Sequence, residues 1–121
     1  MARILVVSDE KATIALTQSA LETAGHTVLV ASSVWNADCC LRGDGVDVLL
    51  ADLQLPECHD PNVIAYWRED FQEMKILLLS KPATVANFFA LRVMGADDVL
   101  QLPLRPEALL QAVRATLHEE P

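Results

Sequence analysis

The amino-acid sequence predicts an α/β domain in which a five-stranded parallel sheet carries helices on both faces. Two observations lead to this fold class. Short runs rich in Val, Ile and Leu alternate with longer segments of helical period, and the alternation repeats five times along the chain. The length of 121 residues, with 52% hydrophobic and 21% charged residues, fits one globular domain. We therefore expect residues 1–121 to form a single domain.

Each predicted strand is a brief apolar run bounded by polar or turn-forming residues. In chain order the strands are expected at Arg3 to Val7, Thr27 to Ala31, Val46 to Ala51, Lys75 to Leu79 and Asp98 to Gln101. Continuous runs of this kind are typical of parallel strands that are buried on both faces.

The segments between the strands predict helices at Lys11 to Ala24, Val34 to Arg42, Pro61 to Asp70, Thr84 to Met94 and Pro106 to His118. Their ends carry the usual signals. Gly25 and Gly95 stand where a residue in the left-handed conformation ends a helix, and Pro61 and Pro106 occupy first helical positions.

The packing of two helical features is also expected from their spacing. Leu110, Val113 and Leu117 form one apolar stripe on the last helix, which should face the core. Trp35 and Trp67 are isolated from each other, and both are expected to pack where a helix meets the sheet rather than to mark a binding site.

Five strand–helix units in a chain of this length fit the doubly wound, flavodoxin-like fold with strand order 2-1-3-4-5. In such a fold the ligand site lies at the carboxyl ends of strands 1, 3 and 4, beside the point where the strand order reverses. The residues that follow the predicted strands there are Ser8, Asp9 and Glu10; Asp52 to Pro56; Ser80 and Lys81; and Leu102 and Pro103.

Charge and composition exclude several classes of partner. A formal net charge of -8 repels a phosphodiester backbone, so direct binding of nucleic acid is not expected. No apolar run approaches the length of about 20 residues that spans a bilayer, which predicts a soluble, cytoplasmic protein without membrane contact. The cysteines, Cys39, Cys40 and Cys58, are interpreted as reduced thiols because their spacing suits neither disulfides nor a zinc site.

Two carboxylates, Asp9 and Asp52, should converge at the predicted ligand edge. This arrangement suits Mg²⁺, which is held by few protein oxygens and several waters. An aspartate beside such an ion can accept a phosphoryl group, because the ion offsets the charge of the incoming phosphate. The alternative is structural: Asp9 caps the first helix and Asp52 only ends a strand.

The same segments resemble the receiver domain of two-component response regulators from Arg3 to Leu117. The resemblance is carried by Arg3-Ile-Leu-Val-Val-Ser-Asp-Glu10, Asp47-Val-Leu-Leu-Ala-Asp-Leu-Gln-Leu-Pro56, Ile76-Leu-Leu-Leu-Ser80 and Ala90-Leu-Arg-Val-Met-Gly-Ala-Asp-Asp98. It implies that Asp52 is the phosphoacceptor, that Asp9, Asp52 and the main-chain carbonyl of Gln54 bind Mg²⁺, and that Ser80 contacts the phosphoryl oxygens.

The chain departs from the receiver pattern at several site positions, which implies weak Mg²⁺ binding and weak or lost phosphorylation. Ser8 stands where the family usually has a second acid, and Leu102 stands where it has a lysine. Val99 replaces the aromatic switch residue. Lys81 replaces a small residue at the rim of the site; its ammonium either pairs with Asp52 or Asp9, or is solvated as an ordinary loop residue.

The resemblance leaves two functions in competition. One is a receiver that takes a phosphoryl group from a histidine kinase or another signalling protein; the other is a pseudo-receiver that acts as a protein-interaction module without phosphorylation. A flavin-binding domain or an aspartyl phosphatase fits poorly, since acids follow the first strand and Gln54 stands where a second acid is needed, so no enzyme is expected. Some receivers form a homodimer through charged side chains, and the charges that resemble them here are Arg92, Asp97, Asp98, Glu107 and Arg114. The alternative is that these side chains are only solvated.

Overall fold

The computed structural model describes residues 2–43, 45–81, 92 and 95–117. Five strands form one parallel sheet in the order β2-β1-β3-β4-β5. The strands are β1 (Arg3–Val7), β2 (Thr27–Ala31), β3 (Val48–Asp52), β4 (Lys75–Ser80) and β5 (Asp98–Gln101). The helices are α1 (Lys11–Thr23), α2 (Val34–Leu41), the 3-10 helix η1 (Pro56–His59), α3 (Pro61–Asp70) and α5 (Pro106–Thr116). The predicted flavodoxin-like sheet and its strand order are therefore confirmed.

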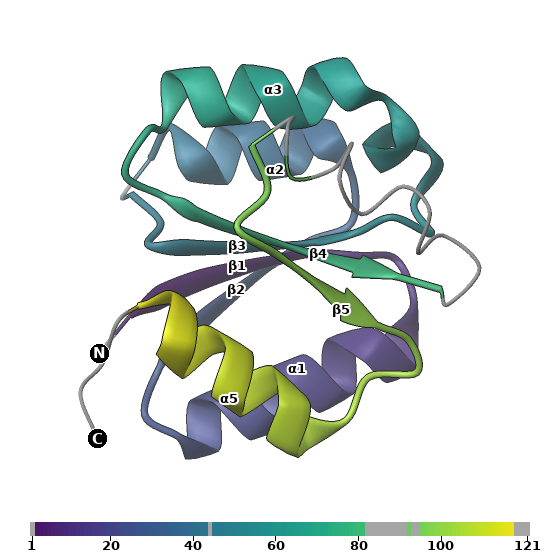
Figure 1. The fold of residues 1–121 in the computed structure, drawn as a ribbon, viewed down its shortest axis with the longest axis vertical. Helices are drawn as coiled ribbons and strands as arrows, with labels where there is room; N and C mark the ends of the chain where they lie inside the picture. The colour runs from purple at the N-terminus through teal and green to yellow at the C-terminus, as the bar shows by residue number, and fades with distance from the viewer. Residues whose placement is uncertain (1, 44, 82–91, 93–94, 118–121) are drawn as a thin grey trace.

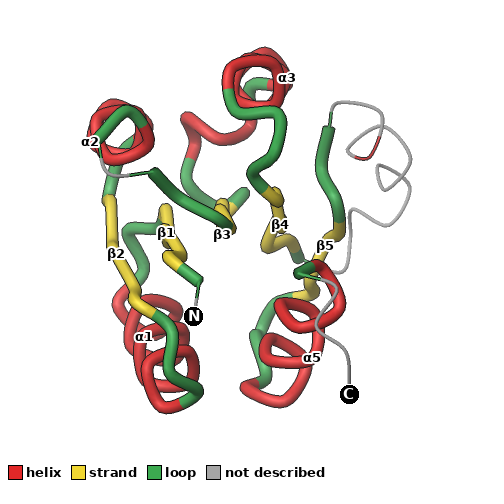
Figure 2. Tube along the Cα trace, turned by 90° about the vertical axis from the view of Figure 1, so that its left-hand side faces the viewer, coloured by secondary structure: helices red, strands yellow, loops and turns green. Residues whose placement is uncertain are grey.

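The molecule has three layers, with α2 and α3 on one face of the sheet and α1 and α5 on the other (Figures 1 and 2). Alternation along β1 explains why both faces are covered. Leu5 and Val7 belong to the core under α2 and α3, whereas Ile4 and Val6 belong to the core under α1 and α5, and all four are completely buried. Successive side chains of a strand point to opposite faces, so a continuous apolar run supplies two cores at once.

The helix expected at Thr84 to Met94 falls on residues 82–91 and 93–94, which lie outside the described residues. The described part of the chain holds four α-helices, not five. Three strand boundaries also differ from the prediction, since β3 begins at Val48 and ends at Asp52, and β4 continues to Ser80. Asp52 pairs with Leu79, and Ser80 pairs with Gln101. Backbone pairing therefore extends both strands to residues whose polar side chains do not predict a strand.

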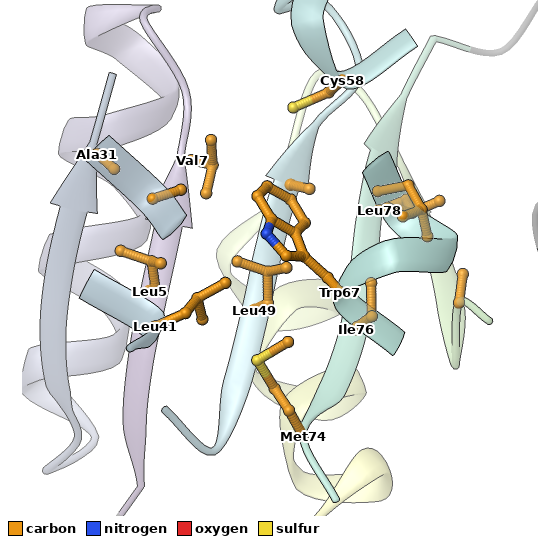
Figure 3. Close-up of a cluster of buried hydrophobic side chains, with 14 of the residues drawn as sticks. Leu5, Val7, Ala31, Leu41, Leu49, Cys58, Trp67, Met74, Ile76 and Leu78 are labelled. Carbon is orange, nitrogen blue, oxygen red and sulfur yellow. The ribbon is translucent and has the colours of Figure 1, made fainter. Parts of the chain in front are cut away.

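The two tryptophans take opposite positions. Trp67 is completely buried in the core between α3 and the sheet, where its ring lies among Leu49, Ile76 and Met74 (Figure 3). Trp35 is 76% exposed, so its predicted packing against the sheet is wrong. The reason is its place on α2, whose buried residues Ala37 and Leu41 form the inward stripe.

The inward stripe of α5 also differs from the prediction. Leu109, Ala112 and Val113 are the buried residues, while Leu110 and Leu117 are only partly buried against the same core. The inward stripe is therefore centred on Leu109, Ala112 and Val113, which follow the i, i+3, i+4 spacing of one helix face.

The connection that leads into β5 is held by Arg68 of α3. Its guanidinium donates to the carbonyl oxygens of Gln72, Met74 and Gly95 and forms an ion pair of 2.8 Å with Asp97. Gly95 has a φ of 121°, and a Cβ there would lie 2.7 Å from the Cβ and Cγ of Arg68. Only glycine fits this position without displacing the arginine.

Within the described residues, no helix is long and apolar enough to span a membrane.

Candidate functional site

The carboxyl ends of β1, β3 and β4 bring the predicted site residues to one edge of the sheet. Val7 pairs with Ala51, so Ser8 follows β1 at the level of Asp52, the last residue of β3. Ser80 ends β4 beside β5, and its carbonyl oxygen accepts a 2.8 Å hydrogen bond from the amide of Leu102. Strand pairing alone thus places Ser8, Asp52, Ser80 and Leu102 around one point.

Asp52 is the buried acid of this edge, with 1% of the residue exposed. Its Oδ2 accepts a 2.7 Å hydrogen bond from the Ser8 hydroxyl, and its Oδ1 accepts a 2.9 Å hydrogen bond from the Gln54 amide. Ser8 is completely buried and also accepts, at 3.1 Å, from the amide of Glu10. Two donors therefore satisfy a carboxylate that would be costly to bury alone.

The two acids predicted to bind metal lie in different environments. Asp9 directly follows Ser8 and is exposed, whereas Asp52 is buried. Gln54 is half-buried, and its side chain lines a groove at this edge. Among the described residues, no group of three or more His, Cys, Asp or Glu side chains is placed to hold a metal ion. The available oxygen donors are two carboxylates and a main-chain carbonyl, which is a sparse set for Mg²⁺.

A groove of about 490 Å³ lies at this edge of the sheet, lined by residues of α1, by Gln54 and Lys81, and by the loop after β5. Leu16, Leu102 and Leu104 supply apolar walls, and Lys81 and Glu10 are among its polar lining residues. Leu102 contributes no charge to this groove, because its side chain is aliphatic. The pairing of Lys81 with Asp52 or Asp9 stays a prediction.

Ser80 lies at the end of β4 opposite Gln101 of β5, and Val99 of β5 lies opposite Leu78 of β4. Ser80 is 3% exposed, and its hydroxyl donates a 3.3 Å hydrogen bond to the carbonyl oxygen of Lys81. Val99 is partly buried and packs against the core on the α2 and α3 side. Its side chain is a compact aliphatic group and contributes no ring of its own to this core.

Cys58 lies in η1, close to the site, but as a core residue. It is 2% exposed, and its pKa is raised to about 12, first by burial and then by the negative charges of Asp52 and Glu57. A thiol with this pKa stays protonated at neutral pH and is neither a nucleophile nor a metal ligand. This agrees with the interpretation of the cysteines as reduced thiols.

The charged residues considered for a dimer are brought together only in part. Arg92, Asp97 and Asp98 line one hollow of about 340 Å³. Asp97 is already engaged, since its Oδ2 accepts from both Arg68 and the amide of Ile76. Glu107 and Arg114 are exposed on the first and last turns of α5 and do not line this hollow.

One role in the site was not anticipated: Ser8 is a hydrogen-bond donor to Asp52 and not only a missing acid. The signal that could have revealed it is register. Strands 1 and 3 are neighbours in the predicted order, and both predicted strands end one residue before a polar side chain. Two such side chains at the same level of adjacent strands are within hydrogen-bonding reach.

Comparison with known proteins identifies the family to which this chain is similar. The model of the response regulator receiver domain matches residues 4–114. The transcriptional regulatory protein CpxR of Klebsiella pneumoniae is 31% identical over 117 residues, covering 97% of this chain and 50% of CpxR. The alginate biosynthesis transcriptional regulatory protein AlgB of Pseudomonas aeruginosa is 30% identical over 115 residues, covering 95% of this chain and 26% of AlgB. The chain thus spans half or less of the length of these two relatives.

Solved structures show the same architecture. The receiver domain of TorR, the response regulator of the TMAO respiratory system, superposes with a TM-score of 0.89 at 28% identity and covers 98% of both chains. A response regulator from Thermotoga maritima superposes with a TM-score of 0.90 at 25% identity, covering 98% of this chain and 99% of its own.

Proposed function

Because the chain belongs to the response regulator receiver family of two-component systems, we propose that Asp52 is its phosphoacceptor and that it accepts a phosphoryl group only weakly. In the reaction, an Asp52 carboxylate oxygen attacks the phosphorus of a phosphohistidine on a partner kinase. The P–N bond breaks, its electron pair remains on the imidazole, and an acyl phosphate forms on Asp52. The module signals through this modification and is not itself an enzyme.

The observation that carries the proposal is the short hydrogen bond from Ser8 to Oδ2 of Asp52, at 2.7 Å between two buried residues. A donor to either oxygen of the carboxylate stabilises its unmodified, charged form and makes it a weaker nucleophile. Ser8 also brings no negative charge to the site, whereas a carboxylate in its place would add a ligand for a cation. Both effects lower the rate of phosphoryl transfer.

The apolar side of the site supports the same conclusion. Leu102 lines the groove that Gln54 and Lys81 also line, and it has no group that can pair with a phosphoryl oxygen. Lys81 lines the same groove and directly follows β4 in the sequence. We propose that the Lys81 ammonium pairs with Asp52 or Asp9 and so neutralises part of the negative charge that a lysine in place of Leu102 would neutralise.

Mg²⁺ is the cofactor of the proposed reaction, bound weakly. Asp9, Asp52 and the main-chain carbonyl of Gln54 would hold it, with water completing its shell. The ion would offset the negative charge of the phosphoryl group as it approaches Asp52. The fit is limited, because Asp52 is committed to two hydrogen bonds and Asp9 is the other acid available.

The proposed partners are a histidine kinase or another signalling protein in the cytoplasm, with neither nucleic acid nor membrane bound directly by this domain. A homodimer would use the surface that contains Arg92, Asp98, Glu107 and Arg114. Asp97 contributes less to that surface, since Arg68 of its own chain holds its carboxylate.

A pseudo-receiver that binds partners without phosphorylation is the second candidate. Val99 favours it, because a compact aliphatic group packed in the core offers no second position for a switch to populate. In this alternative, occupancy of Asp52 would not change the surface formed by β5 and α5.

The test is intact-mass analysis after incubation with acetyl phosphate and Mg²⁺, with an Asp52→Ala variant as the matched control. We expect the unaltered chain to gain one phosphoryl mass in a minor fraction of molecules and the Asp52→Ala variant to gain none. Equal gain in both proteins would refute Asp52 as acceptor. Complete conversion of the unaltered chain would refute weak acceptance, and no gain at any time would favour the pseudo-receiver.

A further inference from the structure

The two large hydrophobic side chains that are exposed in the described part of the chain lie at the same place. Trp35 of α2 is 76% exposed and Tyr66 of α3 is 48% exposed. Both line a groove of about 450 Å³ between these helices, together with Val34 and Val63. The helices lie side by side on the face of the sheet opposite α1 and α5 (Figures 1 and 2).

Trp35 leaves a large apolar surface in contact with water, and burying that surface against a partner is favourable. Isolated exposed apolar residues are ordinary, but two aromatic rings and two valines around one hollow form a continuous patch. Tryptophan and tyrosine are also the residues that most often dominate the binding energy of protein interfaces.

The charge around the groove indicates what would bind there. Asp38 and Glu57 are among its lining residues, and none of the lining residues in the described part of the chain is Lys or Arg. Arg42 lies nearby, but its guanidinium is paired with Asp38 and Asp70 and lies over the Tyr66 ring at 5.5 Å. The chain thus already seats one guanidinium between an aromatic ring and carboxylates.

Glu57 and Trp35 provide a carboxylate and an aromatic ring that could bind a second cation in the same way. The Oε1 of Glu57 accepts a 3.3 Å hydrogen bond from the amide of Val34, which holds this carboxylate at the first turn of α2 next to Trp35. A cationic side chain that packs on an indole ring and pairs with a carboxylate gains from both contacts.

We propose that the α2–α3 groove is a docking site for a basic, amphipathic segment of a partner protein. Apolar side chains of that segment would pack on Trp35, Tyr66 and the valines, and its Lys or Arg would pair with Glu57. A second copy of this chain is disfavoured, because each copy carries a net charge of -8 and the same acidic rim. The proposal does not depend on the phosphorylation of Asp52.

The test uses a random library of peptides of about 15 residues displayed on phage, selected on the immobilised full chain and counter-selected on Trp35→Ala. We expect the enriched peptides to be basic, with aliphatic or aromatic anchors. Their affinity should fall at least about tenfold in Trp35→Ala and in Tyr66→Ala, and several-fold in Glu57→Gln, and it should weaken with salt. Glu22→Gln, an exposed acid on α1, is the matched control and should bind as the unaltered chain does.

Three results would overturn the proposal. The first is enrichment of acidic or neutral peptides, and the second is absence of any peptide that distinguishes the chain from Trp35→Ala. The third is sedimentation showing a dimer of the chain that Trp35→Ala dissociates, because the groove would then hold a second copy. Thermal unfolding of Trp35→Ala should match that of the unaltered chain, since the side chain is mostly exposed.

Discussion

Replacing Ser8 by alanine removes the donor that faces Oδ2 of Asp52. The two residues are buried to within 1% of their surface, so water does not readily take the place of the lost hydroxyl. Asp52 keeps one donor, the amide of Gln54 at 2.9 Å. The amide of Glu10 also loses its 3.1 Å acceptor, but Glu10 is exposed and water can replace that bond at little cost.

The size of the effect follows from the charge of the acceptor. A hydrogen bond to an ionised group contributes about 1.5–3 kcal/mol, so we expect Ser8→Ala to lower the free energy of unfolding by about 2 kcal/mol. With an entropy of unfolding of about 2.1 cal/mol/K per residue, that loss corresponds to a fall of about 8 °C in Tm for a chain of 121 residues.

The assay is urea unfolding at neutral pH, followed by far-UV circular dichroism. Ser19→Ala, which removes an exposed hydroxyl from α1, is the control and should change the free energy of unfolding by less than about 0.5 kcal/mol. A double-mutant cycle with Asp52→Ala isolates the pair and should give a coupling above about 1 kcal/mol. Loss of less than about 0.5 kcal/mol in Ser8→Ala, or no coupling, would refute the role given to this hydrogen bond.

Three further outcomes are expected. Gly95→Ala should lower the free energy of unfolding by more than about 2 kcal/mol in the same urea assay, because its Cβ meets Arg68 at 2.7 Å and its φ is positive; an unchanged value would contradict this. A thiol reagent such as DTNB at pH about 8 should modify the exposed Cys39 rapidly but Cys58 only on unfolding, and rapid modification of Cys58 would contradict its burial. Burial raises the pKa of Cys58 from 9.0 to about 12, so the stability that its protonated form contributes is complete below pH 9.0 and is lost as the pH rises toward 12. Calorimetry should give a Kd for Mg²⁺ weaker than about 1 µM, and Ser8→Asp should tighten it by supplying a third carboxylate; unchanged affinity in the variant would contradict the assignment.

The sheet could be predicted because its strands are continuous apolar runs. Ile4 to Val7 are apolar at every position, which only a strand with a core on both faces requires. The end of β3 was placed too early because Asp52 is polar, and hydrophobicity cannot report that its backbone pairs with β4. Strand ends depend on neighbours that are distant in the sequence.

Helix faces were less predictable than strand faces. On α2 the inward residues Ala37 and Leu41 are four apart, a spacing that leaves Trp35 pointing elsewhere, yet the size of the indole suggested burial. The eight residues of α2 are too few for periodicity alone to decide which side faces the sheet.

The site could be predicted as a set of positions but not as a set of contacts. Topology brings Ser8, Asp52 and Ser80 to one edge, because the carboxyl ends of parallel strands meet there. The direction of the Ser8 hydroxyl depends on a rotamer and on the room left by neighbouring side chains, which the sequence does not state. That Ser8 is not an acid can be read from the sequence, whereas its role as a hydrogen-bond donor to Asp52 required the structure.

The central claim is that Ser8 and Leu102 keep phosphoryl acceptance by Asp52 weak. The most direct measurement is the initial rate of phosphoryl incorporation from acetyl phosphate in saturating Mg²⁺, compared between the unaltered chain and a Ser8→Asp, Leu102→Lys double variant. The account predicts a rate at least about tenfold higher in the double variant, equivalent to about 1.4 kcal/mol of barrier, because the site gains a metal ligand and a cation and loses the donor on Oδ2. Equal rates in the two proteins, both abolished by Asp52→Ala, would contradict it.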